Sequence, residues 1–270
     1  MPPPSIARRP GAAGAGMKLG LVVGLIVLLL GGIGGATWWA RTNRVAIDPD
    51  TLCPEQGPSA IHAILIDRSD PLTPLQQARV RQRIDEIVES APVGGRVAIY
   101  LAESDGVEAL PPALALCNPG RDANPLYQNP RRLRERYEQT FRDRIDALLA
   151  RLMLPNPRQT SPIMESLKAL CIDAMKPVPR GIPLQLSIVS DMIQHSPIAS
   201  HYRNRDYRAL LRSPRLQTLA VDCKGADVDI LYLLRPTPQG RPGVQNRAHQ
   251  EFWDQYLQHL NLRPVRMEPV

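Results

Sequence analysis

Residues 60–73, AIHAILIDRSDPLT, constrain the fold more than any other part of the chain. The first half is a short, isoleucine-rich apolar run bounded by proline on both sides, which predicts a strand buried on both faces. The run then becomes polar at Asp67, Ser69 and Asp70. Open α/β sheets bind ligands at the carboxyl ends of their strands, so these oxygen atoms are candidate ligands for Mg²⁺ or Mn²⁺. The alternative is that they only cap the following helix.

A second stretch, residues 19–40, carries no charge and is long enough to cross a bilayer as a helix. Trp38 and Trp39 would lie at its far interface. A cleaved signal peptide is the alternative, although the apolar run is longer than a usual signal core. We expect residues 1–17 to form a disordered tail, residues 18–40 a transmembrane helix and residues 41–59 a linker.

The net charge of +7 is concentrated around this span. Residues 1–47 contain five basic residues and no acidic one, whereas the rest of the chain has 28 basic and 26 acidic residues. A nearly neutral body argues against a nucleic-acid partner.

Three basic residues precede the span and two follow it, so the positive-inside rule favours an exported body. Twenty-nine arginines against four lysines indicate a GC-rich bacterial genome. We therefore expect an inner-membrane protein with a periplasmic domain.

Four cysteines, Cys53, Cys117, Cys171 and Cys223, all lie in the body. An even number outside the cytosol permits two disulfides with three connectivities, and buried free thiols are the alternative. No two are close enough for a CxxC zinc motif. Cys53 with Cys117 is the first choice, because both lie in proline-adjacent loops that flank predicted strands.

Helical and strand patterns alternate through the body. Thr73 and Gln76 form a capping box at the start of a helix, with Pro74 at its first position. Further strands are expected at residues 96–102, 113–116, 184–189 and 228–234, and further helices at 130–152, from 161, around 209–211 and at 250–260. The alternation predicts an α/β, doubly wound, mostly parallel sheet over residues 60–262 with one antiparallel edge strand, 113–116, followed by a tail at 263–270.

Three polar ends converge if these strands are neighbours: Asp67 with Ser69, Ser161 at a helix start, and Asp191 after a strand. This order resembles the von Willebrand factor A domain and its metal-ion-dependent adhesion site. The family pattern is a strand ending in DxSxS, a threonine before a helix, often followed by proline, and a strand ending in Ser/Thr-Asp. Over residues 61–260, DRSDP, TSPIMESLKAL and IVSDM supply the matching segments.

The resemblance implies a Mg²⁺ or Mn²⁺ ion held by Asp67, Ser69, Ser161 and Asp191. The chain departs from the pattern at Pro71, which replaces the second serine and cannot ligate a metal, so either Asp70 or Thr73 compensates or the site is degraded. Further candidates that could compensate, or add a contact to a partner, are Asp70, Thr73, Thr160 and, for the partner, His195. The other notable histidine, His62, is interpreted as a paired or edge residue of the first strand.

Two functions fit these patterns. The first is a membrane-anchored protein-binding or scaffolding module of an envelope or mobile-element system, without catalysis, in which an acidic side chain of a partner protein completes the coordination of the metal. The second is a Mg²⁺-dependent phosphohydrolase of the haloacid dehalogenase type. That chemistry requires a second acid two residues after the nucleophilic aspartate, and Ser69 occupies that place. The sequence therefore favours the binding module.

Overall fold

The computed structural model describes residues 13–42, 46–102, 110–122, 129–154, 156, 158–174, 181–236 and 243–270. The chain divides into two units, residues 1–46 and a body from Ile47 to Val270. Helix α1, Ala13–Thr42, contains an apolar segment, Gly20–Trp39, with a mean hydropathy of 2.2 and no side chain buried. The expected N-terminal helix is thus present, and its length and composition suit a membrane span. It begins at Ala13, so residues 13–17 are helical and do not belong to the expected disordered tail, whose residues 1–12 lie outside the described part of the chain.

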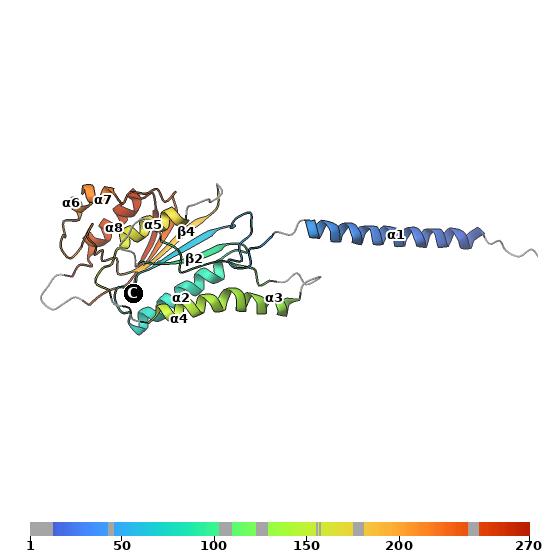
Figure 1. The fold of residues 1–270 in the computed structure, drawn as a ribbon, viewed down its shortest axis with the longest axis horizontal. Helices are drawn as coiled ribbons and strands as arrows, with labels where there is room; N and C mark the ends of the chain where they lie inside the picture. The colour runs from blue at the N-terminus through green and yellow to red at the C-terminus, as the bar shows by residue number, and fades with distance from the viewer. Residues whose placement is uncertain are drawn as a thin grey trace, which may run out of the picture. The chain divides into compact units, whose positions relative to one another are not determined.

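A six-stranded sheet in the order β3-β2-β1-β4-β5-β6 forms the centre of the body (Figure 1). Its strands are β1 Ile61–Ile66, β2 Arg96–Leu101, β3 Leu114–Cys117, β4 Leu184–Ser190, β5 Asp227–Tyr232 and β6 Arg263–Pro269. All neighbouring strands are parallel except β2 and β3. The predicted α/β class, with one antiparallel edge strand, is confirmed.

Helices cover both faces of this sheet (Figure 1). One face packs against α2 Pro74–Ser90, α3 Pro130–Tyr137, the π-helical turn η1 Glu138–Arg142 and α4 Asp143–Leu152; the other packs against α5 Ile163–Ala174, α6 Tyr207–Leu211, α7 Pro214–Gln217 and α8 Arg247–His259. The Thr73–Gln76 capping box is formed at the start of α2. Each face therefore has its own apolar core.

The segment 130–152, expected as one continuous helix, contains the π-turn η1 near its middle. Tyr137, Phe141, Ile145 and Leu149 are buried at intervals of four residues. An α-helix has 3.6 residues per turn, so a stripe with this spacing drifts around its axis. The wider π-turn compensates for the drift and keeps these side chains on the sheet.

The C-terminal residues form β6, so the expectation of a tail at 263–270 is wrong. This strand pairs with β5 in parallel and lies at the sheet edge. Its sequence, RPVRMEP, has two prolines and mostly solvent-accessible side chains, and proline is tolerated at a sheet edge because one side of the strand needs no ladder hydrogen bonds. Because β6 has no buried apolar pattern, the sequence does not predict it as a strand.

The body also begins earlier than expected, since residues 47–59 belong to it and are not a free linker. Leu52 is buried, Ile47 pairs with Pro54, and Cys53 forms a disulfide with Cys117 at the end of β3. This pairing is the one favoured from the sequence. The second disulfide joins Cys171 of α5 to Cys223.

Candidate functional site

Asp67 is the centre of a hydrogen-bonded cluster at the carboxyl end of β1. Its Oδ1 accepts the backbone N–H of Ser69 at 2.9 Å, and its Oδ2 accepts the hydroxyls of Ser161 at 2.8 Å and Ser190 at 3.0 Å. All four residues are buried. The adjacency of β1 and β4 brings Ser190 to this point, and Ser161 approaches from the loop before α5. The carboxylate of Asp67 is thus fixed by three donors.

Asp191 follows β4 and is only 1% exposed. Its Oδ1 accepts the N–H of Ile193 at 2.8 Å. Burial, and then the nearby charge of Asp67, raise the pKa of Asp191 to about 7, although Arg235 and the Ile193 N–H act in the opposite direction. The next residue, Met192, is buried with a φ of 60°, a left-handed conformation that is strained for a side chain of this kind. Asp191 is therefore followed by a strained backbone turn, and contacts with the surrounding residues must stabilise this turn.

The turn at Met192 is held by helix α8. The Met192 carbonyl accepts a hydrogen bond from Trp253 Nε1 at 2.7 Å and one from His249 Nε2 at 3.0 Å. Below the turn, Gln194 donates to the buried carboxylate of Glu165 at 2.8 Å, and Ser196 bonds the same carboxylate. These contacts fix the segment after β4 relative to α5 and α8.

Arg235, which follows β5, is a residue of the site that the sequence did not predict. Its Nε donates to Asp191 Oδ2 at 2.9 Å and its Nη1 donates to the Pro71 carbonyl at 2.8 Å. Gln245 supports it, accepting the Arg235 N–H at 2.7 Å and donating to the Asp191 carbonyl at 2.9 Å. One guanidinium therefore connects the ends of β1, β4 and β5.

The remaining predicted site residues have different surroundings. Asp70 is half exposed, with a carboxylate oxygen 4.0 Å from Arg235 Nε. Thr73 caps α2. The backbones of Ser161 and His195 pair through two hydrogen bonds, and the ring of His195 contacts Tyr202 edge-on, with centroids 5.4 Å apart. Thr160 precedes this bridge. The structure thus unites Asp67, Ser69, Ser161 and Asp191, and places the other candidates around them.

The residues fit a divalent cation only in part. Two carboxylates and two hydroxyls are donors that Mg²⁺ accepts. However, the guanidinium of Arg235 already occupies Asp191 Oδ2, and a second cation beside it would be repelled. With Arg235 in place, the cluster does not fit a bound metal.

An open hollow of about 710 Å³ lies beside this cluster. Its polar wall includes Asp70, Thr73, Gln76 and Arg235, and its apolar wall includes Ile193, Tyr202, Leu234 and Val244. Tyr202 is 54% exposed and Leu234 is 48% exposed. Large apolar side chains next to a few fixed polar groups are typical of a binding surface.

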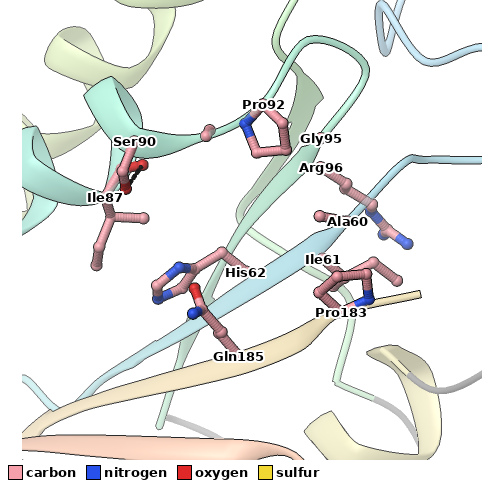
Figure 2. Close-up of a pocket in the computed structure, with 11 residues that line it drawn as sticks. Ala60, Ile61, His62, Ile87, Ser90, Pro92, Gly95, Arg96, Pro183 and Gln185 are labelled. Atoms are coloured by element: carbon pink, nitrogen blue, oxygen red, sulfur yellow. Dashed lines mark hydrogen bonds between the residues drawn. The ribbon is translucent and has the colours of Figure 1, made fainter. Parts of the chain in front are cut away.

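A smaller hollow of about 40 Å³ lies near the amino ends of β1 and β2, with His62 and Gln185 on its wall (Figure 2). His62 Nε2 lies 2.9 Å from Ser187 Oγ, which confirms the interpretation of a paired histidine. Burial, with a smaller effect of the Arg83 charge, lowers the pKa of His62 to about 4. The space suffices for a few water molecules only, so this hollow is not the candidate site.

No family model matches the chain, and no curated protein matches it. Similar solved structures include the conserved hypothetical protein BatB from Bacteroides thetaiotaomicron, 12% identical, with a TM-score of 0.42 over 78% of this chain and 91% of that one. An aerotolerance-related membrane protein from Bacteroides fragilis NCTC 9343 is 10% identical, with a TM-score of 0.35 over 77% and 90%. These low values support no argument about function, and the fold assignment rests on the strand order.

Proposed function

We propose that this protein is a membrane-anchored, non-catalytic module of the bacterial envelope that binds a partner protein through the carboxyl ends of its strands. The observation that supports this proposal is the hollow of about 710 Å³ next to the Asp67 cluster. Its exposed aromatic and aliphatic side chains, Tyr202 and Leu234, resemble the anchors of protein interfaces. His195, whose ring contacts Tyr202, would orient that anchor.

A binding role accounts for Asp67 better than catalysis does. A nucleophilic aspartate must present a free oxygen to the phosphorus atom, whereas both oxygens of Asp67 accept hydrogen bonds from the protein. The position two residues later, where a phosphohydrolase needs an acid, carries Ser69. The arrangement is that of a rigid frame for the surface above it.

The binding face can be tested with a photo-crosslinking amino acid placed at single positions of the full-length protein in cells. We expect probes at Tyr202 and Leu234 to give discrete higher-mass adducts, because these side chains are exposed on the wall of the hollow. A probe at Val93, which is 66% exposed and lies between α2 and β2, is the matched control. Adducts from Val93 alone, or from none of the three positions, would contradict the proposed face.

We also propose that the body lies in the periplasm. All four cysteines are paired, and disulfides persist in oxidising compartments but are rare in the cytosol. A thiol-reactive polymer should therefore leave the protein unmodified when it is denatured without a reductant. After reduction, the same polymer should add four labels to each chain. Four thiols that react without reduction, and only after the inner membrane is opened, would show a cytoplasmic body.

A further inference from the structure

We propose that Arg235 is a built-in counter-cation for the buried carboxylates Asp67 and Asp191, so that the fold and its binding face need no divalent metal. The part that concerns binding rests on the function proposed above. The part that concerns charge rests on the cluster alone. The sequence pattern predicts a metal at this point, and the structure places a guanidinium there.

The geometry provides the first argument. Asp67 and Asp191 are both buried at the ends of adjacent strands, where two like charges destabilise each other. Three neutral groups, two hydroxyls and one amide, donate to Asp67. Arg235 is the charged group that contacts Asp191, at 2.9 Å. A buried carboxylate without a counter-charge lowers the stability of the fold. The guanidinium of Arg235 therefore supplies the positive charge that a bound cation would otherwise supply.

The support of the guanidinium provides the second argument. Gln245 holds the backbone of Arg235, and the carbonyl of Pro71 receives its Nη1. Gln245 also donates to the carbonyls of Asp191 and Leu233 at 2.9 and 2.8 Å. These bonds fix the arginine before any partner arrives. Pro71, which the metal interpretation could only treat as a missing ligand, acts here through its carbonyl as a hydrogen-bond acceptor.

The chain offers a matched control for this role. Arg79 of α2 forms a comparable half-buried ion pair with Glu268 of β6, at 2.6 Å. The side chain of Arg79 is 23% exposed and that of Arg235 is 18% exposed. Glu268, unlike Asp191, is not a fully buried carboxylate. Loss of Arg79 therefore removes an ion pair without leaving two buried acids uncompensated.

Thermal melts of the full-length protein in detergent micelles test the charge role, each with EDTA, with millimolar Mg²⁺ and with millimolar Mn²⁺. The parent should melt at the same temperature in all three conditions. R235Q should melt about 6 °C or more below the parent in EDTA. Either metal, or the added substitution D191N, should recover much of that loss. The melting temperature of R79Q should fall less than that of R235Q, and neither metal should change it.

Three outcomes would overturn the proposal: a parent whose melting temperature rises by several degrees with Mg²⁺, an R235Q variant as stable as the parent in EDTA, or an R235Q variant that neither metal nor D191N rescues. If R235Q does not accumulate as folded protein, the melting temperature of R235K tests the charge role instead. This variant retains the positive charge and should keep most of the parent stability without a metal response, and instability equal to that of R235Q would contradict the charge role.

Crosslinking from position 202 in isolated membranes separates this inference from the proposed function. If the adduct forms equally with and without EDTA, the binding face works without metal, as inferred. If EDTA abolishes the adduct, the binding function stands and the metal-independence is wrong. If no adduct forms in either condition, the proposed function fails, while the melts still decide the role of Arg235.

Discussion

Replacing Cys171 and Cys223 together by alanine should lower the free energy of unfolding by about 4 kcal/mol. The two cysteines are 52 residues apart in sequence, and a crosslink that closes a loop of this length restricts the unfolded chain by roughly that amount in the chain-entropy model. Both side chains are buried, so the replacement also removes core contacts. For a body of this size the melting temperature should fall by about 10 °C.

Urea denaturation of the full-length protein in micelles, followed by circular dichroism, measures this effect. The matched control is the double alanine variant of Cys53 and Cys117, which opens a loop of similar length, with a separation of 64 residues. Cys53 is half buried and Cys117 is fully buried, so this variant should lose a similar chain-entropy contribution and somewhat fewer core contacts. A Cys171/Cys223 variant within 1 kcal/mol of the parent would show that this disulfide is not a major source of stability.

The central strands and α2 could be predicted because their signals are local. An uninterrupted apolar run is enough to mark β1, and the capping box of Thr73 and Gln76 fixes the start of α2 within a few residues. The polar ends of β1 and β4 are visible for the same reason. Ser190 could also have been chosen, since it is adjacent to Asp191 and its hydroxyl completes the hydrogen bonds of Asp67.

Arg235 and β6 could not be predicted in this way, since their roles depend on tertiary position. Arg235 lies 44 residues after Asp191 and shares no motif with it, and only the pairing of β4 with β5 brings them together. Strand β6 carries the signature of a solvated segment, and its pairing follows from the path of the chain through α8. A charge that lies far away in the sequence can replace the ion that a local motif predicts.

A pair of buried histidines, His201 and His249, likewise could not be predicted, because their contact depends on tertiary position. His201 Nδ1 lies 3.0 Å from His249 Nε2, and both rings are fully buried. Tyr232 contacts His249 Nδ1 at 2.7 Å, and His249 Nε2 contacts the Met192 carbonyl. These contacts suit a neutral His249 that accepts from Tyr232 and carries its proton on Nε2. The pair therefore supports the strained turn after Asp191 in its uncharged form.

Burial is the largest cause of a lowered pKa at both positions, about 3 for His201 and about 4 for His249, and the charge of His249 lowers the pKa of His201 further. The unfolded chain, with histidine pKa values near 6.5, binds more protons than the folded protein below that pH. The contribution of the pair to stability is thus complete above about pH 6.5 and is lost as the pH falls through the folded pKa values of about 4 and about 3. His62, with a pKa lowered to about 4, acts in the same direction.

Asp191 opposes this trend. Its pKa is raised to about 7 in the folded protein, so folding binds a proton there between about pH 4 and 7, and acidification through that range stabilises the folded state. Three histidines against one carboxyl leave a net uptake of about two protons on unfolding. The free energy of unfolding should therefore fall by about 3 kcal/mol between pH 6.5 and pH 5.

Urea denaturation at pH 7.5, 6.5, 5.5 and 5.0 gives the slope, and single variants assign it. His201→Leu should reduce the slope by about one proton, because it replaces a buried titrating ring by an apolar side chain of similar size. Stability that is constant from pH 7.5 to 5 in the parent would show that the buried histidines do not resist protonation. An equal slope in the parent and the His201 variant would assign the pH dependence to other groups.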